Sequence, residues 1–312
     1  MGYVTVPGKI TLLGEHAVVY GYPALVMAIN LYTRAAAGDG EGAVKIESAY
    51  PGGRVETKIG MDGEGGDELP YVKAAIKKVW EMQGTRRAAN VTINSDLPYG
   101  SGLGSSASVS VAVLAAYSLY YGVKFQPEQL AKLGREIEVQ VQGKASPMDT
   151  LAVSLGGLIK VVPPEKFEKM GEDFEVEAII ACVSKEKNTG ESVAFVRKRK
   201  DELGSKFDEI LEEIGSLVES SSKAIREHDL TQLCSLMNRN EELLEELGVV
   251  TERSLNLVRR ARALGAAGAK ISGGGFGGCV VVLGGDEKVA MSLAPIADRV
   301  FMVTKSGGVR YA

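Results

Sequence analysis

The sequence predicts an α+β protein of two domains, and three observations support this fold class. The chain has 312 residues, a length typical of about two domains. Its N-terminal half alternates short apolar runs with glycine-rich turns, the pattern of strands. Residues 190–268 have an almost entirely helical pattern, and a strand–glycine–strand segment follows them. Because the composition changes near residues 165–175, we expect domains at 1–168 and 169–312, with a last strand that could return to the first domain.

Strands and a few helices make up the predicted N-terminal domain. Alternating apolar residues predict strands at 4–6, 10–13, 24–30, 44–47, 55–59 and 91–96. An amphipathic pattern predicts a helix at 71–82, and an apolar run predicts one at about 105–121. A further helix is expected to begin at Pro127, since proline suits the first helical turn.

The remaining elements follow from the same signals. A strand pair at 157–162 and 176–183 is expected around the turn at Pro163 and Pro164. Apolar stripes predict helices near 208–227, 230–247 and 252–264. The last elements are expected to be strands on both sides of a glycine hinge at 272–278, a helix at about 287–297 and a strand at 300–304.

Composition predicts a cytoplasmic protein whose partners are small molecules. The formal net charge of −4 gives no basis for a nucleic-acid surface. No apolar run reaches the roughly 18 residues that a membrane span needs, and the N-terminal segment lacks the apolar core of a signal peptide. The cysteines Cys182, Cys234 and Cys279 are odd in number and widely spaced. We therefore expect free thiols in a reducing cytoplasm, rather than a disulfide framework or a zinc cluster.

The segment PYGSGLGSSA, residues 98–107, carries the strongest functional signal. Three glycines and three serines lie between a predicted strand and a predicted helix. Such small side chains expose backbone N–H groups, and the helix start adds unpaired N–H groups and the positive end of a dipole. This combination favours an anion site, and a nucleoside triphosphate is the expected ligand. A tight turn capped by serine is the structural alternative, but six small residues within eight positions exceed what a cap needs.

Two known nucleotide-binding motifs do not describe this loop. It is not a Walker A loop, because no GxxxxGK[ST] occurs in the chain. It is not a dinucleotide fingerprint, because Ser105 stands where the third glycine would fall.

A second segment, PGKITLLGEHAVVYG at residues 7–21, brings polar residues to a strand end. Lys9 precedes the strand-like run, and Glu15 and His16 follow the glycine that ends it. Side chains beside such a turn are well placed to meet a ligand. The structural alternatives are a solvated edge lysine and ordinary turn residues.

Two carboxylates come from the region of residues 127–150. Glu138 lies at the border of the apolar stripe of the predicted helix, and Asp149 follows in the loop after the turn at Ser146 and Pro147. Carboxylates in these positions suit Mg²⁺ and a hydroxyl proton, respectively. Taken alone, a glutamate at the border of a helix is usually solvated.

A third segment, SGGGFGG at residues 272–278, formally contains GxGxxG. A strand follows it where a dinucleotide site needs a helix, so that site is excluded. A glycine-rich hairpin is the structural alternative. We expect a second loop that brings its backbone close to the active site.

Taken in their order along the chain, these segments resemble the GHMP kinase superfamily, which includes galactokinase and the homoserine, mevalonate and phosphomevalonate kinases. The resemblance covers nearly the whole chain. Within the superfamily, residues 7–29 and the segment KNTGESVAFVR at 187–197 are similar to the compact, archaeal-type mevalonate kinases. The resemblance implies an N-terminal domain like ribosomal protein S5 domain 2 and a ferredoxin-like C-terminal domain. It also implies a homodimer that uses ATP to phosphorylate the 5-hydroxyl of mevalonate in isoprenoid biosynthesis.

The resemblance assigns roles to individual residues. Asp149 is the candidate catalytic base and Lys9 lies beside it, while Glu15, His16 and Thr189 contact mevalonate. Mg²⁺ is held by Ser106 and Glu138. ATP is held by residues of the two glycine loops: Pro98, Gly100, Ser101, Gly102, Leu103, Gly104, Ser105, Ser106, Ala107, Gly274 and Gly275.

One departure keeps other functions open. Phe276 makes the third segment GGGFGGC, closer to galactokinase than to the GAGGGGC typical of mevalonate kinases. The alternatives are a kinase for phosphomevalonate, galactose or homoserine, a non-catalytic sensor of ATP and a metabolite, and a diphosphomevalonate decarboxylase. Asp149 and the loop at 98–107 argue against a sensor, and the GEHAVVYG segment argues against galactokinase and the decarboxylase.

Overall fold

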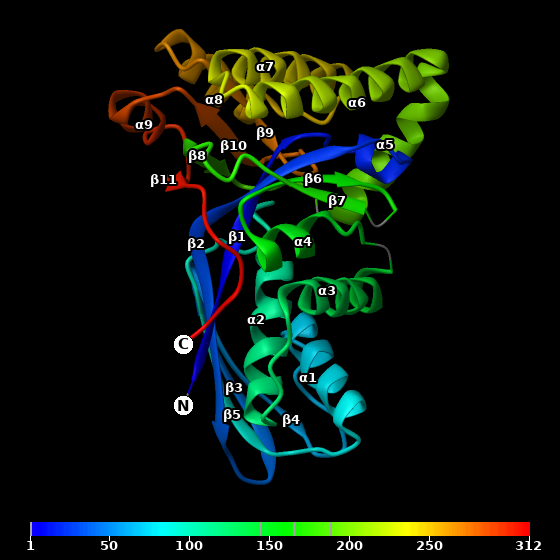
Figure 1. Ribbon diagram of the computed structural model, residues 1–312, viewed down its shortest axis with the longest axis vertical. Coiled ribbons are helices and arrows are strands. Elements are labelled where there is room, and N and C mark those ends of the chain that lie inside the picture. The colour runs from blue at the N-terminus through cyan, green and yellow to red at the C-terminus, as the bar shows by residue number, and fades with distance from the viewer. Residues whose placement is uncertain (1, 144, 165, 188) are drawn as a thin grey trace.

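The computed structural model describes residues 2–143, 145–164, 166–187 and 189–312 and confirms the α+β class. Figure 1 shows helices α1–α4 on one face of a long first sheet, and helices α6–α8 over a second sheet at the other end of the molecule. Both ends of the chain lie side by side on the first sheet.

Among the described residues, the first sheet has eight strands in the order β12-β1-β2-β5-β3-β4, with β6 paired to β2 and to β7. Their bounds are β1 (Tyr3–Leu13), β2 (Ala24–Asp39), β3 (Ala43–Tyr50), β4 (Gly53–Gly60), β5 (Ala89–Ser95), β6 (Leu158–Val162), β7 (Lys166–Met170) and β12 (Arg310–Tyr311). Strand β1 is continuous where two strands were predicted. A register shift between Pro7 and Gly8 absorbs the apparent break, as a β-bulge does.

Helix α2 is the core of the first domain. The helices here are η1 (Ala17–Tyr20), α1 (Pro70–Gln83), α2 (Ser105–Tyr120), α3 (Pro127–Gln142) and α4 (Met148–Leu155). Helix α2 is apolar on all sides, and Val111, Leu114 and Tyr117 are fully buried. A helix of this kind is stable only inside a protein. Its burial fixes the helix start, and hence the loop before it, in the middle of the molecule.

The second sheet is antiparallel and has the order β11-β8-β10-β9. Its strands are β8 (Glu177–Val183), β9 (Gly268–Ser272), β10 (Gly278–Leu283) and β11 (Arg299–Thr304). The helices are α5 (Thr189–Leu203), α6 (Ser205–Arg226), α7 (Leu230–Leu247), α8 (Glu252–Ala263) and α9 (Glu287–Leu293). Strand β11 stays in this sheet, whereas the short β12 that follows pairs with β1 of the first sheet.

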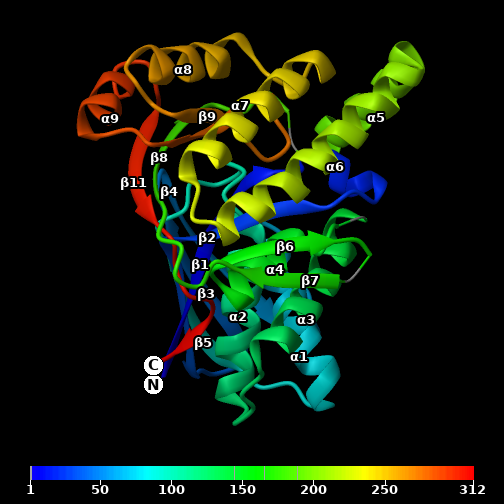
Figure 2. The ribbon, with the colours of Figure 1, turned by 45° about the horizontal axis from the view of Figure 1, so that its top comes forward.

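The two halves of the chain share an apolar core. Ile10 and Leu25 of the first sheet belong to one buried cluster with Ile180 and Val281 of the second. Helix α6 also contacts β2, η1 and β7 (Figure 2). The ends of β1, β8, β9 and β10 therefore meet at the junction, which is where the three motif segments lie.

The predicted hairpin of 157–162 and 176–183 is wrong. Strand β6 pairs with β7, whereas β8 belongs to the second sheet. Residues 166–169 of β7 are exposed, so this edge strand lacks the apolar alternation by which strands are recognised.

The expectation of free cysteines is wrong for two of the three. Cys182 and Cys279 are directly opposite each other in β8 and β10 and form a disulfide, whereas Cys234 is free and buried. The two partners are 97 residues apart in sequence, so only the strand register brings them together. In the described part of the chain, no helix combines the length and apolarity that crossing a membrane requires.

Candidate active site

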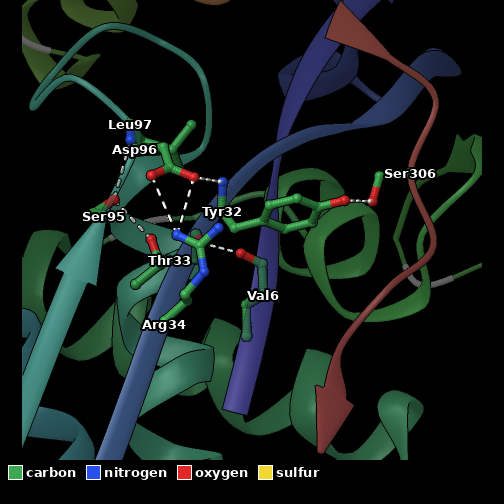
Figure 3. A network of polar contacts seen from close by, with 9 residues as sticks. Val6, Tyr32, Thr33, Arg34, Ser95, Asp96, Leu97 and Ser306 are labelled. Carbon is green, nitrogen blue, oxygen red and sulfur yellow. Dashed lines mark hydrogen bonds and ion pairs between the residues drawn. The ribbon is translucent and has the colours of Figure 1, made fainter. Parts of the chain in front are cut away.

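A polar network fixes the base of the loop at 98–107 (Figure 3). The backbone N–H of Tyr32 donates to the Asp96 carboxylate at 3.0 Å, and the N–H of Asp96 donates to the Tyr32 carbonyl at 2.8 Å. Arg34 adds an ion pair with Asp96 at 3.2 Å. The Tyr32 hydroxyl lies 3.1 Å from that of Ser306. The loop therefore leaves the sheet from a point held by β2 and by the C-terminal segment.

The loop itself leaves its backbone donors free for a ligand. Gly100, Gly102 and Gly104 have φ values of 69°, 84° and 72°, a region that glycine adopts without strain. Gly104 is the N-cap of α2, and no side chain caps this helix. A serine cap, the structural alternative, is therefore absent. The first N–H groups of a buried helix then need another partner, and an anion supplies it.

The second glycine loop lies directly against the first. A Cβ on Gly102 would stand 3.0 Å from the Ser272 carbonyl oxygen, and one on Gly278 would stand 3.1 Å from that of Ser101. The Ser272 hydroxyl also accepts the N–H of Thr11 at 2.8 Å. Segments of β1, β9 and the loop at 98–107 thus form one continuous surface, and glycine is required where the backbones approach.

Lys9 and Asp149 form an ion pair beside these loops. The Lys9 Nζ lies 3.0 Å from Asp149 Oδ1 and donates to the Thr11 hydroxyl at 3.2 Å. Lys9 is 2% exposed and Asp149 29%, so the carboxylate can still meet a ligand. The aliphatic part of the Lys9 side chain packs directly on Gly104. A Cβ added at Gly104 would stand 2.8 Å from Lys9 Cγ, which is too close for ordinary contact.

The position of Asp149 differs from the prediction of a loop residue. It lies in the first turn of α4, where the helix dipole favours a carboxylate. The segment after the turn at Ser146 and Pro147 contains only eight helical residues, too short for a clear helical stripe in the sequence.

Glu138 is a buried carboxylate that forms no ion pair with any residue in the described ranges. It is 3% exposed, and its Oε1 accepts the Ser106 hydroxyl at 3.0 Å. Burial, followed by repulsion from Asp149, raises the pKa of Glu138 to about 8, while the Ser106 hydrogen bond and Lys9 oppose this shift. The site therefore has room for additional positive charge.

His16 is neutral and has an unused nitrogen. Burial is the main cause that lowers the pKa of His16 to about 4, and nearby Lys185 and Lys270 lower it further. The ring hydrogen-bonds to the backbone of Gly274. Its Nε2 is buried and has no hydrogen-bond partner among the described residues. Since a buried polar atom is costly to leave unpaired, this nitrogen is available to a ligand.

Glu15 is engaged in a buried network. Its carboxylate is paired with the ammonium of Lys270, and Asn240 donates to it at 3.4 Å. Lys270 is fully buried in β9, and the neighbouring N–H of Ile271 donates to Glu241 at 2.9 Å. The network ties the turn that carries His16 to β9 and α7.

The other predicted residues take part in different ways. The Pro98 carbonyl accepts the Ser101 hydroxyl at 2.8 Å, and the Leu103 carbonyl accepts the N–H of Lys9 at 2.9 Å. The side chain of Ala107 is buried in the core, so it shapes the loop without facing the site. The side chain of Thr189 lies outside the described residues.

Three residues near the site were not predicted from the sequence. Lys185, in the loop after β8, is close to Lys9 and Asp149. Tyr71 of α1 lies near Glu138 and Ser106, and its pKa is raised mainly by burial. Lys270 was missed although it carried a signal, because a lysine between apolar residues in AKIS indicates a buried pair. Lys185 and Tyr71 lie in patterns that also fit solvated residues.

Family models match the chain in its two halves. The model for the GHMP kinases N terminal domain matches residues 70–157, and the model for GHMP kinases C terminal matches residues 221–294. A galactokinase galactose-binding signature matches residues 2–39. A mevalonate kinase of Pyrococcus horikoshii is 38% identical to the chain, with 96% of the chain and 93% of the relative covered. The chain belongs to the GHMP kinase family. Its curated relatives place it among the mevalonate kinases of that family.

Two further comparisons agree with this assignment. A mevalonate kinase of Saccharolobus solfataricus is 34% identical, with 89% of the chain and 88% of the relative covered. The crystal structure of the Methanococcus jannaschii mevalonate kinase matches with a TM-score of 0.84 and 28% identity, covering 98% of each chain. The protein is therefore a kinase with the two-domain GHMP architecture.

Proposed function

We propose that this GHMP kinase transfers the γ-phosphoryl group of ATP to the 5-hydroxyl of mevalonate, with Asp149 and Lys9 as its catalytic residues. The observation that carries the proposal is the Lys9–Asp149 pair at 3.0 Å. It lies beside an uncapped helix start and two touching glycine loops. The names of the curated relatives supply the substrate.

Phosphoryl transfer depends mainly on positioning and on stabilising negative charge. The N–H groups of the loop at 98–107 and of the start of α2 bind the phosphates of ATP in this proposal. Lys9 stabilises the charge that develops on the transferred group. The partly exposed carboxylate of Asp149 accepts the proton of the attacking hydroxyl as a general base.

Ser106 and Glu138 are proposed to hold Mg²⁺, and their surroundings fit this ion. A buried carboxylate with a raised pKa and a neighbouring hydroxyl form an oxygen donor pair short of positive charge. Within the described ranges, no group of three or more His, Cys, Asp and Glu side chains gathers as a metal cluster. This agrees with Mg²⁺, which commonly takes one or two carboxylates together with phosphates and water. When bound, the ion neutralises phosphate charge.

On the acceptor side, His16 is proposed to contact mevalonate through its unpartnered Nε2. Glu15 holds the turn of His16 through Lys270 and so acts as a positioning residue in this proposal. Galactose is the second candidate acceptor, because the galactose-binding signature matches residues 2–39. The contribution of Thr189 to substrate binding stays a prediction.

A coupled ADP-release assay with Mg·ATP tests the proposal, with mevalonate, phosphomevalonate, galactose and homoserine compared side by side. We expect turnover of mevalonate alone and a kcat at least about 10²-fold lower for Asp149→Asn, the lower end of the general-base range. Turnover of another acceptor would refute the substrate and keep the fold. ATP binding without turnover of any acceptor would favour a sensor. Near-normal turnover by Asp149→Asn would remove this residue from the mechanism.

Homodimeric assembly and a cytoplasmic location complete the proposal as predictions. Light scattering on the purified chain tests the first, and fractionation of cells that express it tests the second.

A further inference from the structure

Lys185 lies in a short segment that is fixed on both sides. The hydroxyl of Ser184 donates to Asp298 at 2.8 Å, and the N–H of Glu186 donates to the Phe276 carbonyl at 2.8 Å. Between them, the Cα of Lys185 packs against Gly277, where an added Cβ would stand 3.0 Å away. Ser184 and Glu186 are exposed, whereas Lys185 is partly buried. In this alternation the side chain of Lys185 turns away from solvent.

Phe276 explains how the segment is held. The ammonium of Lys187 lies 3.9 Å from the centroid of the Phe276 ring and 4.5 Å from that of Phe195. The two rings pack edge to face at 4.9 Å. Phe276 adopts a φ of 56° and donates its N–H to the Val249 carbonyl at 2.8 Å. A bulky residue in this conformation is strained and needs such support. The residue that departs from the mevalonate kinase pattern thus anchors the loop that carries Lys185.

Among the residues that the structure describes, Lys185 has no ion-pair partner of its own. Its ammonium interacts electrostatically with Lys9, Asp149 and His16, and the loop that carries it packs on the second glycine loop through Gly277. Asp149 is already paired with Lys9 at 3.0 Å, and Glu15 is paired with Lys270. A partly buried cation beside another cation is stabilised when an anion binds.

The acceptor substrate is the better source of that anion. The phosphates of ATP have the N–H groups of two glycine loops and of the start of α2. On the acceptor side, His16 is neutral, and the carboxylates of Glu15 and Asp149 would repel an anion. Because Lys9 is committed to Asp149, Lys185 is the cation left for an acceptor with a carboxylate.

We propose that Lys185 binds the carboxylate of mevalonate and thereby selects an anionic acceptor over a neutral sugar. This inference rests on the proposed function. It assigns to a residue outside the three motif segments the discrimination between the two acceptors that the chain's similarities suggest.

Lys185→Met tests the inference, because methionine keeps the length of the side chain and removes its charge. Lys185→Arg restores a cation, and Glu186→Gln is the matched control on an exposed neighbour. We expect Lys185→Met to raise the KM for mevalonate about 10- to 100-fold, the range of a hydrogen bond between charged groups. The kcat and the KM for ATP should stay within about threefold of wild type. Lys185→Arg should recover part of the loss, and Glu186→Gln should behave as wild type.

A neutral acceptor separates a charge effect from a structural one. The primary amide of mevalonate keeps both hydroxyls and has no carboxylate. Wild type and Lys185→Met should use this amide with equal KM, since neither can form the ion pair with it. Calorimetric binding of mevalonate without ATP should show the same loss for Lys185→Met.

Three results would overturn the inference. An unchanged KM for mevalonate would exclude contact with its carboxylate. A raised KM for ATP alone would assign Lys185 to a phosphate. An equal loss on mevalonate and on its amide would mark a structural role. Wild type is assayed first. If wild type phosphorylates galactose and not mevalonate, the proposed function fails as well. If wild type phosphorylates mevalonate and Lys185→Met has an unchanged KM for it, only the role of Lys185 is refuted.

Discussion

Two alanine substitutions in the same loop can isolate the contribution of the Lys9 position to catalysis. Gly104 and Gly100 have nearly equal φ values, 72° and 69°. An alanine at either position destabilises the folded state by a similar amount, about 1–2 kcal/mol, because its Cβ is strained in the left-handed region. At Gly104 the new Cβ would stand 2.8 Å from Lys9 Cγ, whereas at Gly100 no atom lies within 4 Å. The two variants therefore differ mainly in whether Lys9 is displaced.

The size of that displacement follows from contact distances. Ordinary contact begins at 3.4 Å, so Lys9 Cγ must move by about 0.6 Å from its 2.8 Å separation, and such overpacking costs about 1–3 kcal/mol. A displacement of about 1 Å at a catalytic group lowers rates about 10²-fold. We expect Gly104→Ala to reduce kcat roughly 10- to 100-fold and Gly100→Ala to stay within about threefold of wild type.

The assay for this pair is steady-state ADP release at saturating ATP and mevalonate, together with urea unfolding of both variants. Gly104→Ala should also be less stable than Gly100→Ala by about 1–3 kcal/mol, the overpacking cost. Equal kcat values for the two variants would refute the reasoning, because they would show that the packing of Lys9 on Gly104 does not set the geometry of the catalytic pair.

Three further predictions concern the metal ligands and the buried network. Ser106→Ala and Glu138→Gln should each raise the Mg²⁺ concentration needed for half-maximal activity, and wild-type titration curves for both would remove them as ligands. Burial is the main cause that raises the pKa of Glu241 from its ordinary 4.5 to about 7. Its contribution to stability is therefore present below about pH 4.5 and lost as the pH rises through about 7. Glu241→Gln should flatten that decline in urea unfolding, and parallel pH profiles would contradict this. Lys270→Met should destabilise the fold by about 3–5 kcal/mol because it leaves Glu15 buried and unpaired, and adding Glu15→Gln should recover part of the loss.

The parts of the fold that could be predicted from sequence are those with a strong local signal. The glycine hinge between β9 and β10 and the long helices α6, α7 and α8 lie close to where patterns placed them. Local signals failed where the pairing partner, and not the residues of the segment itself, decides the structure. The segment 166–170 is a strand because β6 offers it a pairing edge. The disulfide exists because β8 and β10 share a register.

The candidate site likewise has one half that local sequence signals predict and one half that depends on tertiary contacts. The half that we propose to bind phosphate consists of backbone, and glycine-rich segments indicate exposed backbone directly in the sequence. The acceptor-facing half consists of charges whose meaning depends on burial and partners. In our proposals, Glu15 is a positioning residue because Lys270 pairs with it, and Lys185 is a binding residue because no ion pair involves it among the residues that the structure describes. In sequence, the apolar neighbours of Lys270 indicate that it is buried but do not name its partner, and the pattern around Lys185 also fits a solvated lysine. The chemistry of phosphate binding is therefore readable from composition and spacing, whereas acceptor selectivity requires the tertiary pairing of charges. Substitutions that alter selectivity should for this reason fall at Lys185 and its supports, outside the glycine loops.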